Sequence, residues 1–269
     1  MATITVVSDP ADPRLDDYRD LTTADRRPDR PGGRGLVIAE GVVVVRRLLD
    51  SPYPLRSVLG VPRRLDDLAA DLAHLDVPAY STDADTMATT VGFHLNRGVL
   101  AVADRAAPVD PVALARSVRT LAVLEGVGDH ENLGALFRNA AALGVDGVLL
   151  GPRCSDPLYR RSVRVSMGHV LRVPFAELPG SWPASLGLVR DAGLRVAALT
   201  PSGSVPIVDA GLTGRRVALL LGAEGPGLTP EALAAADVAV RIPMASGVDS
   251  LNVATAAAVA FHAVGAAVP

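Results

Sequence analysis

A glycine-rich turn in the C-terminal half of the chain carries a single carboxylate where a ligand could bind. The turn Gly222-Ala223-Glu224-Gly225-Pro226-Gly227 directly follows Val217–Leu221, an apolar run typical of a buried strand. Open α/β sheets bind ligands at the carboxyl ends of their strands, and glycines let the backbone approach a ligand closely. The turn therefore predicts a binding site, in which Glu224 orients a hydroxyl group or caps neighbouring backbone amides.

A second block, Ile242-Pro243-Met244 followed by Ser250-Leu251-Asn252, leads into the last predicted helix. Asp249 or Ser250 is expected to cap this helix, because a side-chain oxygen can accept from amides of the first turn. Asn252 has no such simple role, since asparagine is unfavourable early in a helix unless its amide has a partner. The block thus predicts a polar contact for Asn252.

A third block, residues 131–140, overlaps the helix predicted at 132–143 and carries Asn132 and Arg138. Leu133 and Phe137 mark its apolar face, and Arg138 lies off that face. Taken alone, Arg138 fits a solvated helix arginine, and Asn132 fits a helix cap.

In this order and spacing, the three blocks resemble the motifs of the SpoU/TrmH family of RNA 2'-O-ribose methyltransferases, within the SPOUT superfamily. The resemblance covers the C-terminal half and implies methyl transfer from S-adenosylmethionine to a ribose 2'-hydroxyl. The catalytic residues that it implies are Arg138, Asn132, Glu224, Ser250 and Asn252. The cofactor-binding residues that it implies are Thr200, Leu221, Gly222, Glu224, Gly227, Ile242, Met244, Ser250 and Leu251.

The resemblance also suggests which groups take part in the proton transfer. Family proposals make Arg138 the proton acceptor, but arginine stays protonated in proteins. We therefore expect Arg138 to clamp the adjacent phosphate and to stabilise the developing alkoxide. A phosphate oxygen or Glu224 would take the proton, while Ser250 and Asn252 would hold the ribose and the loop.

The fold class expected for the second half is a parallel α/β domain, because predicted strands and helices alternate there. The resemblance adds a deep trefoil knot near the C-terminus and a homodimer whose two subunits complete each active site. The predicted strands are 121–124, 147–150, 171–173, 195–199, 216–221 and 238–241, and the predicted helices are 132–143, 157–167, 183–192 and 251–264.

Two prolines within Ala106–Pro111 mark the best domain boundary, since proline disfavours both helices and central strands. We expect an irregular extension over residues 1–34, an α/β domain over 35–105, a linker over 106–117 and the methyltransferase domain over 118–269. The Arg-rich run 26–34 is either a flexible lead-in or a phosphate-contacting arm. The small domain resembles the ribosomal-protein-like substrate-binding domain of rRNA-modifying relatives, mainly through Glu40-Gly41 and the Val-rich helix that follows.

Arginine supplies all 26 basic residues, and the formal net charge is −3, so composition neither demands nor forbids an RNA partner. Arg160, Arg161 and Arg164 fall on one side of the predicted helix 157–167. They form a solvated face or, in an RNA-modifying enzyme, a phosphate-binding face, and we favour the second reading.

Several other classes of site and location are disfavoured. The single cysteine, Cys154, excludes an intramolecular disulfide and a Cys-rich zinc site, and the histidines lack metal-ligand spacing, so we expect no metal. No apolar run reaches the roughly 18 residues that a membrane span needs, and Met1–Pro10 does not resemble a secretory signal. A cytoplasmic protein without a membrane partner is expected.

Two rival functions come from other classes. A nicotinamide-dependent oxidoreductase would need the G-x-G-x-x-G fingerprint, which the glycine turn does not match. A non-catalytic RNA-binding or ribosome-assembly factor would not need the polar residues of all three blocks. Among RNA substrates, the small domain favours ribosomal RNA, with transfer RNA second.

Overall fold

The computed structural model describes residues 4–21 and 35–265, so the Arg-rich run 26–34 lies outside the described residues. The chain forms two compact units. Unit 1 contains residues 1–107 and 156–172, and unit 2 contains residues 108–155 and 173–269. The chain passes between the units three times, because a segment from the middle of the C-terminal half belongs to unit 1.

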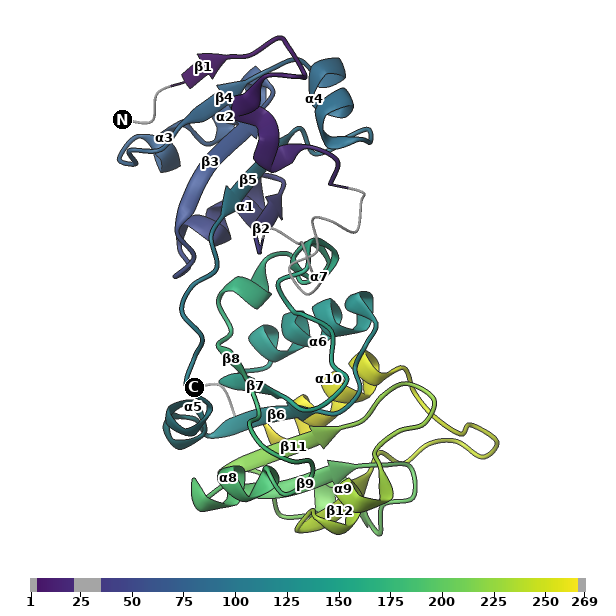
Figure 1. The fold of residues 1–269 in the computed structure, drawn as a ribbon. Coiled ribbons are helices and arrows are strands. Elements are labelled where there is room, and N and C mark those ends of the chain that lie inside the picture. Colours follow the sequence, from purple (N-terminus) through teal and green to yellow (C-terminus); the bar gives the residue numbers. More distant parts are fainter. Residues whose placement is uncertain (1–3, 22–34, 266–269) are drawn as a thin grey trace. The chain divides into compact units, whose positions relative to one another are not determined.

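Unit 2 is built on a seven-stranded sheet in the order β10-β12-β9-β11-β6-β7-β8, and all strand pairings in its described residues are parallel (Figure 1). The inner strands β6, β7 and β11 are buried along their whole length, as in sheets covered on both faces. The predicted parallel α/β class is confirmed. The strands are β6 (Thr120–Leu124), β7 (Gly147–Leu150), β8 (Phe175–Glu177), β9 (Arg195–Leu199), β10 (Val205–Pro206), β11 (Val217–Leu221) and β12 (Val238–Arg241).

Helices cover both faces of this sheet. On one face, α5 (Pro111–Ser117), α8 (Leu186–Asp191) and α9 (Pro230–Ala234) share a hydrophobic core with strand residues such as Val123 and Leu220. Successive strand residues point to opposite faces of a sheet, so the strands also present side chains to the second face. On that second face, α6 (His130–Ala142) packs against α10 (Val253–Val264). Helix α6 carries the third sequence block, and α10 directly follows the second.

Two local predictions in this half are wrong. Residues 111–117 form helix α5, although the prolines suggested a linker, because Pro111 takes the first helical turn, where its missing N–H costs nothing. Asp110 caps this helix by accepting from the Val112 amide at 3.0 Å. The strand predicted at 171–173 is replaced by a 3₁₀ turn, η3 (His169–Leu171), and strand β8 begins at Phe175.

Unit 1 has a five-stranded mixed sheet in the order β1-β4-β3-β5-β2. Its strands are β1 (Ile4–Val6), β2 (Val37–Glu40), β3 (Leu55–Gly60), β4 (Ala79–Ser81) and β5 (Val99–Ala103), and its helices include α1 (Val42–Leu49), α2 (Pro62–Asp67), α3 (Ala69–Leu72) and α4 (Ala84–Val91). The extension expected to be irregular contains β1 and the 3₁₀ helix η1 (Pro13–Tyr18). The side chains of Leu15 and Tyr18 join the core, and this burial orders the segment.

The segment 156–172 joins unit 1 through α7 (Arg160–Val165), which packs on β2. The Arg160 guanidinium donates to Glu40 Oε2 at 3.2 Å and lies 4.7 Å from the centre of the Phe93 ring. The side chains of Arg160 and Glu40 are only 20% and 7% exposed. Burial lowers the pKa of Arg160 because the charged form loses hydration, and the Glu40 carboxylate partly offsets this effect. Arg160 therefore serves as the partner of a buried acid.

Arg160→Ala is expected to lower the free energy of unfolding by about 2 kcal/mol, because it leaves the buried Glu40 carboxylate without its nearest cation. Urea unfolding followed by circular dichroism measures the loss, and hydrogen exchange should place it in β2 and α7. Arg164→Ala is the matched control, since Arg164 is exposed on the same helix. Equal destabilisation by both changes would contradict this role for Arg160.

Candidate active site

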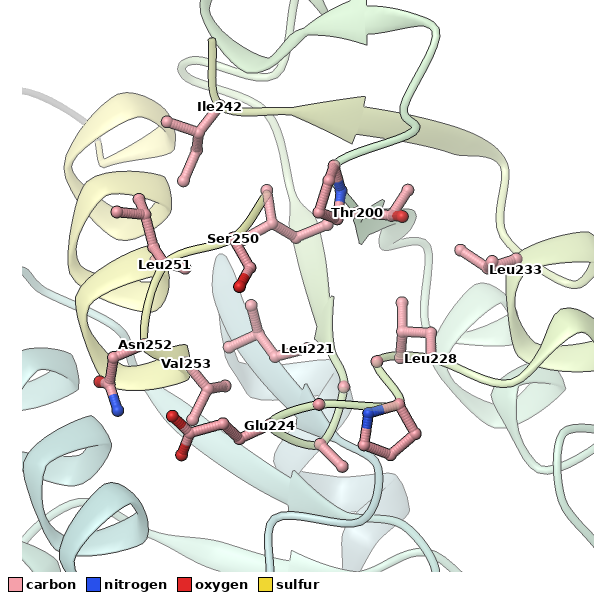
Figure 2. Close-up of a pocket in the computed structure, with 18 of the residues that line it drawn as sticks. Thr200, Leu221, Glu224, Leu228, Leu233, Ile242, Ser250, Leu251, Asn252 and Val253 are labelled. Carbon is pink, nitrogen blue, oxygen red and sulfur yellow. The ribbon is translucent and has the colours of Figure 1, made fainter. Parts of the chain in front are cut away.

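A pocket with a volume of about 360 Å³ lies at the carboxyl end of the unit 2 sheet. Three segments line it: the end of β9, the loop between β11 and α9, and the segment between β12 and α10 (Figure 2). Parallel sheets bind ligands at this edge. Every residue that the sequence predicts for cofactor binding lines this pocket: Thr200, Leu221, Gly222, Glu224, Gly227, Ile242, Met244, Ser250 and Leu251.

The loop after β11 is a tight hairpin. The Gly227 amide donates to the Ala223 carbonyl at 3.0 Å. A Cβ atom on Gly222 would lie 2.4 Å from the carbonyl carbon of Gly227, so only glycine fits at this point. Gly225 and Gly227 have φ values of 89° and 71°, and a Cβ on either would meet nothing within 4 Å. The loop therefore keeps open space beside its backbone.

The side-chain amide of Asn132 joins all three sequence blocks. Its Nδ2 donates to Glu224 Oε2 at 2.7 Å, and its Oδ1 accepts from Asn252 Nδ2 at 2.7 Å. Asn252 in turn caps α10, since its Oδ1 accepts from the Ala254 and Thr255 amides at 3.0 and 3.3 Å. Figure 2 shows the Glu224 carboxylate turned toward Asn252. This hydrogen-bonded chain fixes the orientation of both amides, and it ends on Glu224 as the acceptor.

Two capping roles suggested by the sequence are wrong. Asp129 caps α6 by accepting from the Glu131 and Asn132 amides at 2.9 and 2.8 Å, so the Asn132 side chain is available for Glu224. Asn252 caps α10, which begins at Val253. Ser250 therefore lies in the loop before the helix, and its side chain is directed into the pocket (Figure 2).

Arg138 lies on the exposed side of α6 and does not line the pocket. Leu133 and Phe137 are completely buried, as the predicted apolar face requires. The side chain of Asn139, next to Arg138, donates to the Ala254 carbonyl at 2.8 Å and ties α6 to α10. The structure thus brings Asn132, Glu224, Ser250 and Asn252 together and leaves Arg138 outside the pocket of its own chain.

The arginines predicted to bind RNA all lie on α7 in unit 1. Arg161 and Arg164 are exposed, whereas Arg160 is engaged with Glu40. No group of three or more His, Cys, Asp or Glu side chains that could hold a metal occurs in the described part of the chain. Among the same residues, the helices are too short or too polar to span a membrane.

Sequence reasoning missed one buried carboxylate next to the pocket loop. Glu125 directly follows β6 and is completely buried. The available signal was an acidic residue at the end of an apolar run, where burial is expected and a charged side chain is costly.

Comparisons with known proteins identify the family and the fold of this chain. The model of the SpoU rRNA Methylase family matches residues 119–262. An uncharacterized tRNA/rRNA methyltransferase of Mycobacterium tuberculosis is 56% identical over 259 residues, which cover 95% of this chain and 90% of the relative. The AdoMet-bound rRNA methyltransferase from Sinorhizobium meliloti shares the fold, with a TM-score of 0.79, 26% identity and 97% of each chain covered.

A further solved structure supports the fold alone. The SpoU methyltransferase AviRb from Streptomyces viridochromogenes, in complex with AdoMet, has a TM-score of 0.77 at 22% identity, covering 94% of this chain and 97% of that one. The family model covers more than half of the chain, and the mycobacterial relative covers almost all of it. This chain belongs to the SpoU methylase family.

Proposed function

We propose that this protein transfers a methyl group from S-adenosylmethionine to a ribose 2'-hydroxyl of RNA, with ribosomal RNA as the substrate class. Membership of the SpoU family supports methyl transfer to RNA. The observation that carries the proposal is the hydrogen-bonded chain of Asn132, Glu224 and Asn252, which come from three separate blocks and of which Glu224 and Asn252 line the pocket. Such an arrangement is suited to hold a polar reactant beside a bound cofactor.

The pocket fits S-adenosylmethionine in size and in chemistry. Its volume of about 360 Å³ lies within the range typical of small-molecule sites. Leu221, Leu228 and Ile242 offer apolar walls for an adenine ring, while Glu224 and Ser250 offer polar groups for the ribose and the methionine part. The cofactor supplies an activated methyl group on a positively charged sulfur. AdoMet-bound relatives with the same fold give further support.

The residues of this chain handle the nucleophile. A ribose hydroxyl is a weak nucleophile and must lose its proton near the transition state. Arg138 binds the adjacent phosphate and stabilises the developing alkoxide, while Glu224 or a phosphate oxygen takes the proton. Asn132 holds Glu224 as an acceptor, and Ser250 and Asn252 position the ribose and the loop.

A homodimer belongs to this proposal. Arg138 is exposed and lies outside the pocket of its own chain, which is the arrangement expected if it serves the pocket of a second copy. Each pocket would then combine Glu224 and Asn252 from one subunit with Arg138 from the other. We also place this enzyme in the cytoplasm, where its RNA substrates are.

We propose that the chain in the C-terminal half is threaded into a trefoil knot. β12 lies between β9 and β10 in the sheet, although β10 follows β9 in the sequence. A Cβ atom on Gly203, in the connection between β9 and β10, would lie 2.3 Å from the carbonyl carbon of Val240. Two backbone segments therefore pass each other in direct contact, as threading of one through the other requires.

Transfer RNA is the alternative substrate. The mycobacterial relative is described as a tRNA/rRNA methyltransferase, so its name does not choose between the two. The preference for ribosomal RNA rests on the resemblance of unit 1 to ribosomal-protein-like substrate-binding domains. A non-catalytic RNA-binding or assembly factor is disfavoured, because it would not need the Asn132, Glu224 and Asn252 chain.

Transfer of tritium from labelled S-adenosylmethionine to fractionated ribosomal and transfer RNA tests the proposal. We expect label in ribosomal RNA, recovered after nuclease digestion as a 2'-O-methylated nucleoside. Label on a base would contradict the reaction, and label only in transfer RNA would establish the alternative substrate. Cofactor binding without labelling of either RNA would favour the non-catalytic role.

A further inference from the structure

We propose that Glu125 is a positioning residue. It fixes the spacing between the two ends of the pocket loop 222–228, and it thereby sets the affinity for S-adenosylmethionine without contacting the cofactor. The inference rests on the proposed function, because it concerns the same pocket. It assigns a role in cofactor binding to a buried carboxylate outside the three sequence blocks.

Glu125 holds both ends of this loop. Its backbone N–H donates to the carbonyl of Leu221, just before the loop, at 2.9 Å. Its side chain accepts from Thr229, just after the loop: the Thr229 amide lies 3.0 Å from Oε2, and the Thr229 hydroxyl lies 2.9 Å from Oε1. Leu221 and Leu228 line the pocket, whereas Glu125 and Thr229 do not. One residue behind the pocket thus fixes the spacing between the two ends of its loop.

The Glu125 carboxylate is held from several sides. It is 0% exposed, and the Trp182 indole N–H donates to Oε1 at 2.8 Å. Arg153 Nη2 lies 3.5 Å from Oε1, although the Arg153 side chain is 68% exposed. Burying a carboxylate is costly unless its oxygens accept hydrogen bonds. These donors offset that cost, and they keep the carboxylate aimed at Thr229.

Only a carboxylate satisfies these donors. The N–H groups of Thr229 and Trp182 can donate but cannot accept, and they face different oxygens of Glu125. A glutamine has the same shape but one oxygen and one NH2 group. Whichever way its amide turns, the NH2 group faces one of these two N–H groups. Glu125→Gln therefore removes a hydrogen bond and places two donors against each other.

The effect of Glu125→Gln should appear in cofactor binding. We expect the Kd and the KM for S-adenosylmethionine to rise about tenfold, the usual consequence of losing one hydrogen bond to a charged group. The increase in KM should exceed any decrease in kcat, and the KM for RNA should stay unchanged. Calorimetric titration of the full-length protein with S-adenosylmethionine gives the Kd, and steady-state methyl transfer gives the two KM values.

Three further variants separate loop positioning from general stability. Thr229→Val removes the hydroxyl donor and should raise the KM for S-adenosylmethionine, whereas Thr229→Ser keeps the donor and should leave it unchanged. Trp182→Phe removes a different donor to Glu125 Oε1 but leaves both Thr229 hydrogen bonds in place, so it should lower the melting temperature and raise the KM less than Thr229→Val does.

The outcomes are distinguishable. An unchanged Kd for Glu125→Gln, with a lowered melting temperature, would overturn the inference and leave Glu125 a structural residue only. An equal rise in KM for Trp182→Phe and Thr229→Val would overturn it too, because general loosening would then explain both. Failure of the wild-type protein to bind S-adenosylmethionine would instead refute the proposed function, and this inference with it.

Discussion

Arg138→Ala is expected to reduce the rate of methyl transfer by about 10²- to 10³-fold, the usual effect of removing one group that stabilises transition-state charge. The Kd for S-adenosylmethionine should stay unchanged, because Arg138 does not line the pocket and is exposed on α6. Single-turnover kinetics with the RNA fraction that accepts the methyl group measures the rate of transfer. Calorimetric titration measures the Kd for S-adenosylmethionine.

Arg116→Ala is the matched control for this variant. Arg116 is also an exposed helix arginine of unit 2, and it lies on α5, away from the sequence blocks. Its replacement should leave both the rate of methyl transfer and the Kd for S-adenosylmethionine unchanged. Full activity of Arg138→Ala would refute the catalytic assignment, and a large rise in its Kd would make Arg138 a cofactor-binding residue instead.

Mixing two inactive variants tests whether Arg138 acts in the pocket of a second copy. A dimer that pairs an Arg138→Ala subunit with a Glu224→Ala subunit would contain one intact site if the two residues come from different chains. Activity should then return after the subunits exchange. If both residues act within one chain, neither site is intact, and the mixture stays inactive.

Asn132→Asp should reduce kcat/KM by about 100-fold at pH 8, because it replaces the donor to Glu224 with a second negative charge. Two carboxylates at hydrogen-bonding distance share a proton, so the pKa of one of them is raised. As the pH falls, the pair takes up a proton and regains a donor between the two oxygens. The activity of the variant, relative to wild type at the same pH, should therefore increase toward pH 5.5. Methyl transfer measured across this pH range is the test.

Asn139→Asp gives the matched comparison on the same helix. Asn139 donates to the Ala254 carbonyl at 2.8 Å and ties α6 to α10 rather than to Glu224. This change should lower the melting temperature without a pH-dependent gain in relative activity. If the two variants show the same pH dependence, Asn132 does not act through Glu224.

Much of unit 2 follows from local sequence signals. The apolar runs of β6, β7 and β11 are buried as their composition predicts, and Phe137 takes the buried side of α6. The prolines led to a wrong prediction at α5. Proline breaks a helix in its interior, but it is well suited to the first turn of a helix, which is where Pro111 lies. A boundary signal of this kind does not say on which side of the proline the helix lies.

The contacts that build the site are beyond such signals. Asn132 meets Glu224 across 92 residues and Asn252 across 120, and no periodicity names the partner of a side chain that far away. The family resemblance supplied these residues as a set, but not the hydrogen bonds between them. Glu125 was missed for the same reason, since its partners Trp182 and Thr229 lie 57 and 104 residues away.

The composition of unit 1 from two separate stretches has a consequence for the exchange of parts between relatives. A fragment ending at residue 107 would lack residues 156–172, so β2 would lose its packing partner α7 and Glu40 would lose Arg160. Recombination at a single point after unit 1 would therefore separate residues that must match. On the proposal that unit 1 selects the RNA, a chimera designed to move RNA preference from one family member to another has to transplant both stretches.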